Sequence, residues 1–244
     1  MTSSAGSHRQ KGGPPGGEAE AARPGWFEIG AAAVAYLVLF GVTATVLRLI
    51  PAEDSVGRGL AGYALSALIG VGAFVAAFAV RIREVRPFGV RRAGWKWLLL
   101  GTVIGAAAWW LNIVVTIVYA AVTGDAGSPQ GDYQAAGGAG VVALSATFLL
   151  GAVATPIGEE LAFRGVLANA LNRYGWWADV LVSSAVFAVA HGLNPVLPVA
   201  FVIGVLCAVL FRRTGSIWPG VCVHAANNAS SIVMPLLLAP LLPG

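Results

Sequence analysis

Seven long apolar runs fill most of the sequence, and short polar segments separate them. Most runs are close to the length of about 20 residues that an α-helix needs to cross a bilayer. Pro235 and Pro240 break up the Leu-rich tail, which is too short for another regular crossing. We therefore expect an all-α, polytopic transmembrane helical bundle with about seven or eight membrane helices, the eighth short or re-entrant. The runs cover residues 29–50, 60–80, 97–122, 140–156, 177–191, 196–211 and 217–233.

Composition supports a membrane location for most of the chain. Only 11% of the 244 residues are charged, whereas a soluble domain carries about 25%. The mean hydropathy is +0.78. We expect a single membrane domain over residues 27–244. Residues 1–26 are rich in Gly, Pro, Ser and Ala and have no apolar core, which predicts a disordered cytoplasmic tail and no signal peptide.

The formal charge of +4 comes from cations that lie between the apolar runs and form no continuous stripe. This distribution favours a role in membrane orientation and no binding of nucleic acid. Basic loops alternate with loops poor in cations, which predicts a multi-pass protein of the cell membrane with a cytoplasmic N-terminus. The basic loops carry Arg81, Arg83, Arg86, Arg91, Arg92, Lys96, Arg173, Arg212 and Arg213, and the others carry Glu53, Asp54, Arg58, Asp125 and Asp132.

A small set of ionisable and amide side chains lies inside the apolar runs. A charged group at the bilayer centre costs about 3 kcal/mol or more, so such groups need partners or a water-filled cavity. They occur in three stretches, TPIGEELAFRG, FAVAH and VHAANNAS, which contain both histidines outside the N-terminal tail. The residues are Glu159, Glu160, Arg164, His191, His224, Asn227 and Asn228.

Helix geometry separates the two glutamates. Glu160 and Arg164 are four residues apart and share a helix face, which predicts a structural ion pair. Glu159 is rotated by about 100° from Glu160 and points elsewhere. Counted from the basic loops, Glu159 and His191 both lie at a depth of about 20 Å, and His224 and Asn228 at about 16 and 22 Å. The three stretches can therefore present their polar groups at one level.

This set of residues suggests hydrolytic chemistry. A carboxylate beside an imidazole can deprotonate water, which makes Glu159 and His191 candidate general-base partners. A second imidazole and an amide, from His224 and Asn228, could stabilise an oxyanion. Alternatively, Glu159, His191 and His224 could bind a divalent metal such as zinc, although no HExxH stretch is present. Whether a metal cofactor is needed stays open at this point.

Two other classes of function fit some of the same residues. In a proton-coupled transporter, Glu159 and the histidines would relay protons, but the sequence shows no evident internal repeat. In a non-catalytic bacteriocin-immunity or scaffold protein, the polar groups would only join membrane helices. Each stretch alone is a weak signal. The three in this order, each on an apolar run, favour a functional site.

The three motifs resemble those of the CPBP family of intramembrane proteases, also called the CAAX protease and bacteriocin-processing family. The resemblance rests on an EExxxR motif at 159–164, FxxxH at 187–191 and HxxxN at 224–228, and it covers a catalytic core over residues 140–233. It implies that Glu159 and His191 activate water and that His224 and Asn228 hold the oxyanion. It also implies an intramembrane endopeptidase that resembles type II CAAX prenyl endopeptidases.

The expected partners are therefore the lipid bilayer and a hydrophobic, lipidated or prenylated protein or peptide. We expect Glu160 and Arg164 to order the site, and a water-accessible cavity to open toward the cytoplasm.

Overall fold

A computed structural model describes residues 23–124 and 130–238, and every regular element in these ranges is helical. Residues 1–22 of the predicted tail, and Asp125, lie outside the described residues. The predicted all-α multi-pass membrane fold is confirmed. Within these ranges, six helices are long and apolar enough to cross a membrane: Trp26–Leu49, Ser55–Val80, Trp95–Val122, Val141–Tyr174, Val196–Thr214 and Trp218–Leu238. The remaining predicted run forms a shorter apolar helix, Trp177–Ala190.

The first three spans are simple hydrophobic helices, and the fourth is composite. The simple ones are α1 (Trp26–Leu49), α2 (Ser55–Val80) and α3 (Trp95–Thr123). A short helix, α4 (Gly131–Gly138), precedes the fourth span. That span passes through α5 (Val141–Thr147), the π-helix η2 (Phe148–Ala154), α6 (Thr155–Glu160), the π-helix η3 (Leu161–Ala168), α7 (Asn169–Leu171) and η4 (Asn172–Tyr174).

The fourth span therefore continues well past the boundary near 156 that the sequence predicts. Pro156 has no N–H to donate, but it stands at the first turn of α6 and does not end the helix. The chain ahead of it is in π register, since the Thr155 N–H donates to the Leu150 carbonyl. π-Helical turns are rare and frequently occur at functional sites.

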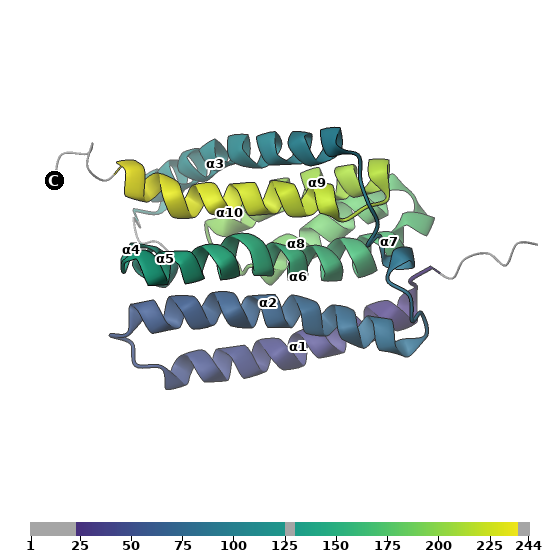
Figure 1. Cartoon of the computed structure of the whole chain (residues 1–244), viewed down its shortest axis with the longest axis horizontal. Coiled ribbons are helices and arrows are strands. Elements are labelled where there is room, and N and C mark those ends of the chain that lie inside the picture. Colours follow the sequence, from purple (N-terminus) through teal and green to yellow (C-terminus); the bar gives the residue numbers. More distant parts are fainter. Residues whose placement is uncertain (1–22, 125–129, 239–244) are drawn as a thin grey trace, which may run out of the picture.

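The last part of the chain forms a short hairpin and a long return helix. The π-helix η5 (Trp177–Val182) and α8 (Ser183–Ala190) form the first arm, which ends at His191. Gly192 takes φ +89°, a left-handed conformation that favours glycine and turns the chain. The second arm is α9 (Val196–Thr214), and α10 (Trp218–Leu238) follows. Figure 1 shows α10 lying between α3 and the α5–α6 segment.

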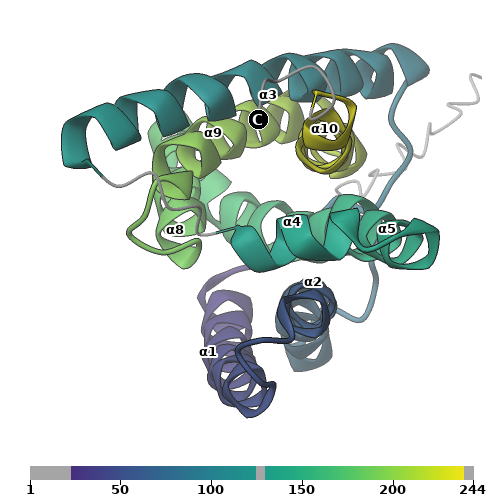
Figure 2. The ribbon, with the colours of Figure 1, turned by 90° about the vertical axis from the view of Figure 1, so that its left-hand side faces the viewer.

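The two ends of the bundle have different loops (Figure 1). At one end, Arg81 binds Glu28 of α1, Arg91 binds the carbonyl oxygens of Thr214 and Gly215, and Arg173 binds the Pro24 carbonyl. At the other end lie the α1–α2 turn and α4 (Figures 1 and 2). There Arg58 pairs with Asp132 at 2.9 Å between Nε and Oδ2. We call these the arginine-rich end and the α4 end.

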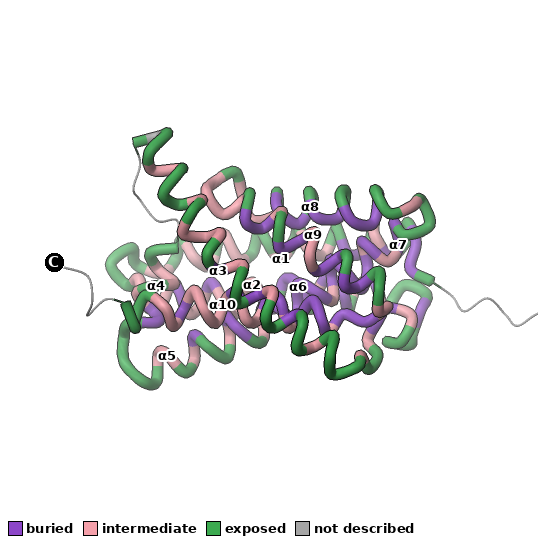
Figure 3. The backbone as a smooth tube through the Cα atoms, turned by 90° about the horizontal axis from the view of Figure 1, so that it is seen from above, coloured by how far each residue is buried: buried purple, intermediate pink, exposed green. Residues whose placement is uncertain are grey.

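Glycines bring the site-bearing helices into close contact. A Cβ on Gly70 of α2 would lie 2.3 Å from the carbonyl carbon of Gly158 in α6, and one on Gly105 of α3 would lie 2.1 Å from the Val223 carbonyl oxygen in α10. Such small-residue contacts are typical of membrane helix packing. Buried residues concentrate along the inner helices α6 and α9, and α1 buries only Glu28 and Ala32 (Figure 3).

Candidate active site

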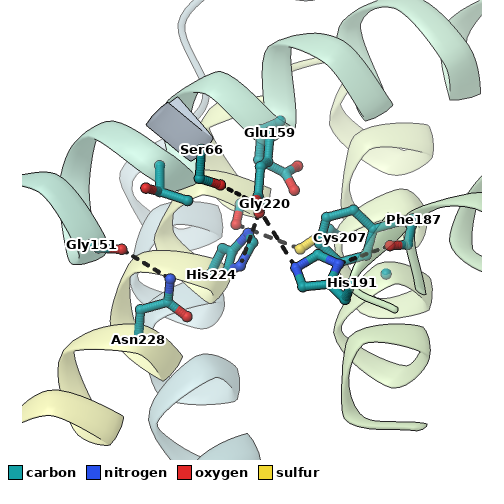
Figure 4. Close-up of polar contacts among 12 residues, drawn as sticks. Ser66, Gly151, Glu159, Phe187, His191, Cys207, Gly220, His224 and Asn228 are labelled. Atoms are coloured by element: carbon teal, nitrogen blue, oxygen red, sulfur yellow. Dashed lines mark hydrogen bonds and ion pairs between the residues drawn. The ribbon is translucent and has the colours of Figure 1, made fainter. Parts of the chain in front are cut away.

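Glu159 lies at the centre of the polar cluster. Its side chain projects from α6 and is 10% exposed. Three groups from three other elements surround the carboxylate: the Ser66 hydroxyl of α2 donates to Oε1 over 3.4 Å, His224 Nε2 of α10 lies 3.3 Å from Oε2, and His191 Nε2 lies 3.9 Å from Oε1. Figure 4 shows both imidazoles directed at the carboxylate. The structure thus brings together three of the residues that the sequence singled out.

The backbone fixes the tautomer of His191. Its Nδ1 lies 2.8 Å from the Phe187 carbonyl oxygen, which can only accept a hydrogen bond. Nδ1 therefore carries a proton, and in the neutral form of the ring the lone pair of Nε2 is directed toward Glu159. His191 caps α8 at φ −84° and ψ −1°, and its side chain is 25% exposed, so the ring borders both the carboxylate and open space.

We assign His224 the other tautomer, with its proton on Nε2 and its lone pair on Nδ1. Its Nδ1 is buried without a hydrogen-bond partner, whereas Nε2 faces the Glu159 carboxylate at 3.3 Å. Because burying an unpaired lone pair is less unfavourable than burying an unpaired N–H, we assign the proton to Nε2. His224 then donates toward Glu159. One imidazole therefore offers a donor to the site, and the other offers an acceptor.

This arrangement selects the kind of group that can lie between His191 and Glu159. His191 Nε2 and Glu159 Oε1 are both acceptors, and at 3.9 Å they form no hydrogen bond with each other. A group that bonds both must donate two protons, and a water molecule does so. The same two acceptors can increase the nucleophilicity of that water and take one of its protons.

Glu160 and Arg164 form a separate buried pair behind the cluster. Arg164 Nη1 lies 3.2 Å from Glu160 Oε1, and both side chains are almost fully buried. Arg164 also donates from Nη2 to the Gly204 carbonyl of α9 and lies over the Phe187 ring, 4.5 Å from its centroid. The predicted i,i+4 pair is therefore present, and it connects the motif helix to α8 and α9.

Phe187 and Ser66 belong to the site, although the sequence reasoning assigned them no role. The Phe187 ring is buried and contacts both imidazoles, with centroids 4.6 Å from His191 and 5.6 Å from His224. Phe187 is the first residue of the FxxxH motif, and this position in the sequence could have indicated its role. Ser66 was harder to identify, because the only indication is a hydroxyl in a helix composed mainly of small apolar residues.

Asn228 lies one turn beyond His224 and is engaged with the backbone of the motif helix. Its Nδ2 donates to the Gly151 carbonyl oxygen over 2.9 Å (Figure 4). In the π register, that carbonyl would accept from residue 156, which is a proline without an N–H. Asn228 thus replaces the hydrogen bond that Pro156 cannot make. A primary amide carries two N–H groups, so one N–H remains for another acceptor.

A cavity of about 480 Å³ lies beside the cluster. Its wall includes Glu159, both histidines and Asn228, and continues to Tyr133 and Gln134 of α4. Burial raises the pKa of the Tyr133 phenol, and the nearby Glu159 carboxylate raises it further, so this wall presents a neutral hydroxyl. The cavity therefore extends from the cluster to the α4 end. If the N-terminus is cytoplasmic, this direction conflicts with the expected cytoplasmic opening.

The residues do not fit the alternative of a metal centre. Within residues 23–124 and 130–238, no group of three or more His, Cys, Asp or Glu side chains is arranged to hold a metal ion. The predicted metal set of Glu159, His191 and His224 is close together. However, in the tautomer assigned above, His224 presents an N–H on the side of the carboxylate, so this ring offers no lone pair there. The metalloprotease interpretation is not supported.

Comparison with known proteins adds one finding. Residues 141–230 match a family model described as type II CAAX prenyl endopeptidase Rce1-like. The matched segment runs from α5 into α10 and includes all three motifs. No match was found among curated proteins or solved structures.

Proposed function

Because residues 141–230 place the chain in the Rce1-like type II CAAX prenyl endopeptidase family, we propose that it is an intramembrane endopeptidase. Its substrate is a hydrophobic or lipidated protein or peptide, and it hydrolyses a peptide bond close to the membrane. The observation that carries this proposal is the pair of acceptors, Glu159 Oε1 and His191 Nε2, which face each other at the spacing that suits one bridging water.

The first step activates that water. The water donates one hydrogen bond to the Glu159 carboxylate and one to His191 Nε2, and its oxygen lone pair is directed at the scissile carbonyl carbon. As the C–O bond forms, Glu159 takes the proton, and the carbonyl π electrons move to the oxygen. The Ser66 hydroxyl, which donates to the same carboxylate oxygen, holds the carboxylate in position.

The second step stabilises the oxyanion. The His224 Nε2–H and the second N–H of Asn228 are the donors assigned to this negative charge. Both project from α10 one turn apart, so they lie on the same side of that helix. The bond from Asn228 to the Gly151 carbonyl limits the motion of the amide, which makes the donor preorganised.

The third step releases the products and closes the proton balance. Protonated Glu159 gives its proton to the amide nitrogen of the substrate as the C–N bond breaks. The intermediate collapses to a carboxylic acid and an amine, and Glu159 returns to the carboxylate form. One water is consumed for each bond hydrolysed, and no other reactant is required.

For the topology, we propose seven crossings, with Trp177–Ala190 as the fifth and shortest, and a cytoplasmic N-terminus in the cell membrane. The support is the strong bias of cations toward the arginine-rich end, on which Arg81, Arg91, Arg173 and Arg212 all lie.

The proposal is tested with purified protein in liposomes and internally quenched peptides, both prenylated CAAX peptides and unlipidated membrane peptides. Wild type is compared with Glu159→Gln and His191→Ala, each with and without a metal chelator. We expect cleavage by wild type and a loss of at least about 100-fold in each variant, the scale of a lost general base. The chelator arm decides whether a metal takes part.

Cleavage that survives in Glu159→Gln would rule out this mechanism. Arg213→Gln, a change at an exposed position of the arginine-rich end, serves as the matched control and should retain wild-type rates. If wild type cleaves none of the peptides and Glu159→Gln leaves the cellular phenotype unchanged, the scaffold function is favoured.

A further inference from the structure

The arginine-rich end and the α4 end differ strongly in charge. Among the described residues, the cations of the arginine-rich end are Arg23, Arg81, Arg83, Arg86, Arg91, Arg92, Lys96, Arg173, Arg212 and Arg213. Near the α4 end there are only Arg48 and Arg58 among these residues, and Arg58 is neutralised by Asp132. Loops of multi-pass proteins that are rich in Lys and Arg stay in the cytoplasm, so the α4 end faces the opposite side of the membrane.

The cavity of the catalytic cluster extends toward this cation-poor end. Its innermost wall is formed by Glu159, Phe187 and His224, and its outer wall by Gln130, Tyr133 and Gln134 at α4. No residue of the loops 81–94, 172–176 or 212–217 lines it. Figure 2, viewed from the α4 end, shows α4 beside the tip of the α8–α9 hairpin, with α3 running across above them.

The walls of the cavity suit an uncharged chain. Among the described lining residues, Glu159 and the two histidines are the ionisable groups besides tyrosine phenols. One wall is apolar and comes from α3 and α9, with Trp109, Ile113 and Val199. The other presents amides and hydroxyls from α10, from α4 and from the polar residues of α3. An extended peptide needs a polar and an apolar wall, because its backbone requires hydrogen-bond partners and its side chains require apolar contact.

Polar groups on that second wall are held in place by each other. The Asn112 amide of α3 donates to Asn227 Oδ1 over 3.2 Å and to Ser231 Oγ over 3.3 Å, and the Ser231 hydroxyl donates to the Asn227 carbonyl. This network fixes α3 against α10 along the passage. The wall beyond the catalytic cluster therefore has an ordered polar surface.

From the charge difference and the cavity's direction, we infer that the catalytic site receives its substrate from the extracytoplasmic side of the membrane, as an uncharged, extended segment of polypeptide that enters past α4. This inference rests on the proposed function for what happens at the cluster. It replaces the cytoplasmic opening expected from the sequence. A cytoplasmic protein tail would lie on the wrong side to reach Glu159 through this cavity.

Cysteine labelling tests the side of entry without requiring activity. In a background with Cys207→Ala and Cys222→Ala, single cysteines replace Gln134 at the mouth, Thr116 on the wall, and exposed Glu84 in the loop at the arginine-rich end. Intact cells and inside-out vesicles are treated with a membrane-impermeant maleimide. We expect Gln134→Cys and Thr116→Cys to react in intact cells, and Glu84→Cys to react only in inside-out vesicles.

The reverse pattern, with Gln134→Cys labelled only in inside-out vesicles, overturns the inferred side of entry whether or not the protein cleaves peptides. External labelling together with no cleavage by wild type contradicts the proposed function and leaves the side of entry standing. The two failures are therefore distinguishable.

Protection from labelling tests the class of substrate. Thr116→Cys is combined with His191→Ala, so that no substrate is consumed while the Glu159 carboxylate is kept, and is labelled in the presence of a blocked Ala/Val/Ser peptide or a matched peptide with lysines. The uncharged peptide should slow labelling on the order of tenfold more than the lysine peptide, because Glu159 at the inner end is the only carboxylate among the described lining residues of the passage. Equal protection by both peptides overturns the selectivity.

Discussion

At the residue scale, two adjacent carboxylates in α6 occupy unlike surroundings. Glu159 faces two imidazoles, a serine hydroxyl and a cavity, whereas Glu160 faces a buried guanidinium that also contacts Phe187 and the Gly204 carbonyl. The rotation of about 100° between neighbours on a helix produces this separation. One carboxylate is therefore accessible to a reactant, and the other is a structural partner.

Replacing each glutamate should separate stability from activity. Glu160→Ala leaves Arg164 buried without its counter-charge, which should lower the free energy of unfolding by about 3–5 kcal/mol. Glu159→Gln should abolish cleavage and leave stability close to wild type. Thermal unfolding in detergent measures the first effect. Equal melting temperatures for Glu160→Ala and wild type would contradict the structural role of the pair.

Phe187 should act as a positioning residue for both histidines. Phe187→Leu keeps the site apolar but removes the ring that contacts His191, His224 and Arg164. We expect kcat to fall about 10-fold or more with little change in KM, because the acceptor on His191 loses its alignment. Phe187→Tyr should restore most of the rate, since it keeps the ring. A rise in KM with kcat unchanged would instead point to a direct contact between Phe187 and the substrate.

At the scale of the elements, small residues set how closely the helices approach. Gly101 and Gly105 are four residues apart on α3, and a Cβ on either would meet a backbone carbonyl oxygen of α10, that of Pro219 at 2.4 Å or that of Val223 at 2.1 Å. His224 directly follows Val223. The contact between α3 and α10 therefore helps to determine where the second imidazole lies.

Gly105→Ala should separate α3 from α10 and disturb the site. Overpacking of this kind lowers the free energy of unfolding by about 1–3 kcal/mol, and here the opposing atom is backbone and cannot rotate away. Gly41→Ala in α1 is the control, because nothing lies within 4 Å of the added Cβ. The melting temperatures and cleavage rates of both variants are measured. Equal effects of the two substitutions would contradict the role of the α3–α10 contact in placing His224.

The sequence was sufficient to predict several elements and not others. Hydropathy predicted the apolar runs, and helix spacing predicted the pairing of Glu160 with Arg164. The end of the fourth apolar run at about 156 was too early, although the depth estimate already counted this span to the basic loop at Arg173, close to its observed end at Tyr174. The helix continues past Pro156 because a π-helical register and a hydrogen bond from Asn228 compensate for it, and neither is visible in a 3.6-residue pattern. Ser66 was missed because its role depends on a tertiary contact 93 residues away.

At the scale of the whole molecule, an ion pair between Arg81 and the buried Glu28 at the arginine-rich end holds the first two spans together. Arg81 follows α2 and binds both carboxylate oxygens of Glu28 at 3.0 Å, and the Gly25 N–H donates to the same carboxylate. The Glu28 side chain is fully buried, whereas Arg81 is about half exposed. α1 depends on this contact because few of its own residues are buried.

Arg81→Ala should therefore lower the melting temperature, since it leaves the buried Glu28 carboxylate with backbone N–H donors and without its counter-charge. Arg83→Ala removes a neighbouring exposed arginine and should have little effect. The difference in melting temperature between the two variants is the measurement. A difference near zero would show that Glu28 is satisfied without the arginine.

The brevity of the α8 arm has a consequence for the surrounding lipid. η5 and α8 contain 6 and 8 residues, a rise of about 21 Å, in a hydrocarbon layer of about 30 Å. The helical part of this arm therefore ends about 9 Å short of the opposite surface, the turn before α9 completes the crossing, and the acyl chains beside the arm must shorten or tilt to match. This hydrophobic mismatch should make the proposed peptidase activity sensitive to bilayer thickness, so the cleavage rate should rise in liposomes of shorter-chain phosphatidylcholines and fall in those of longer-chain ones.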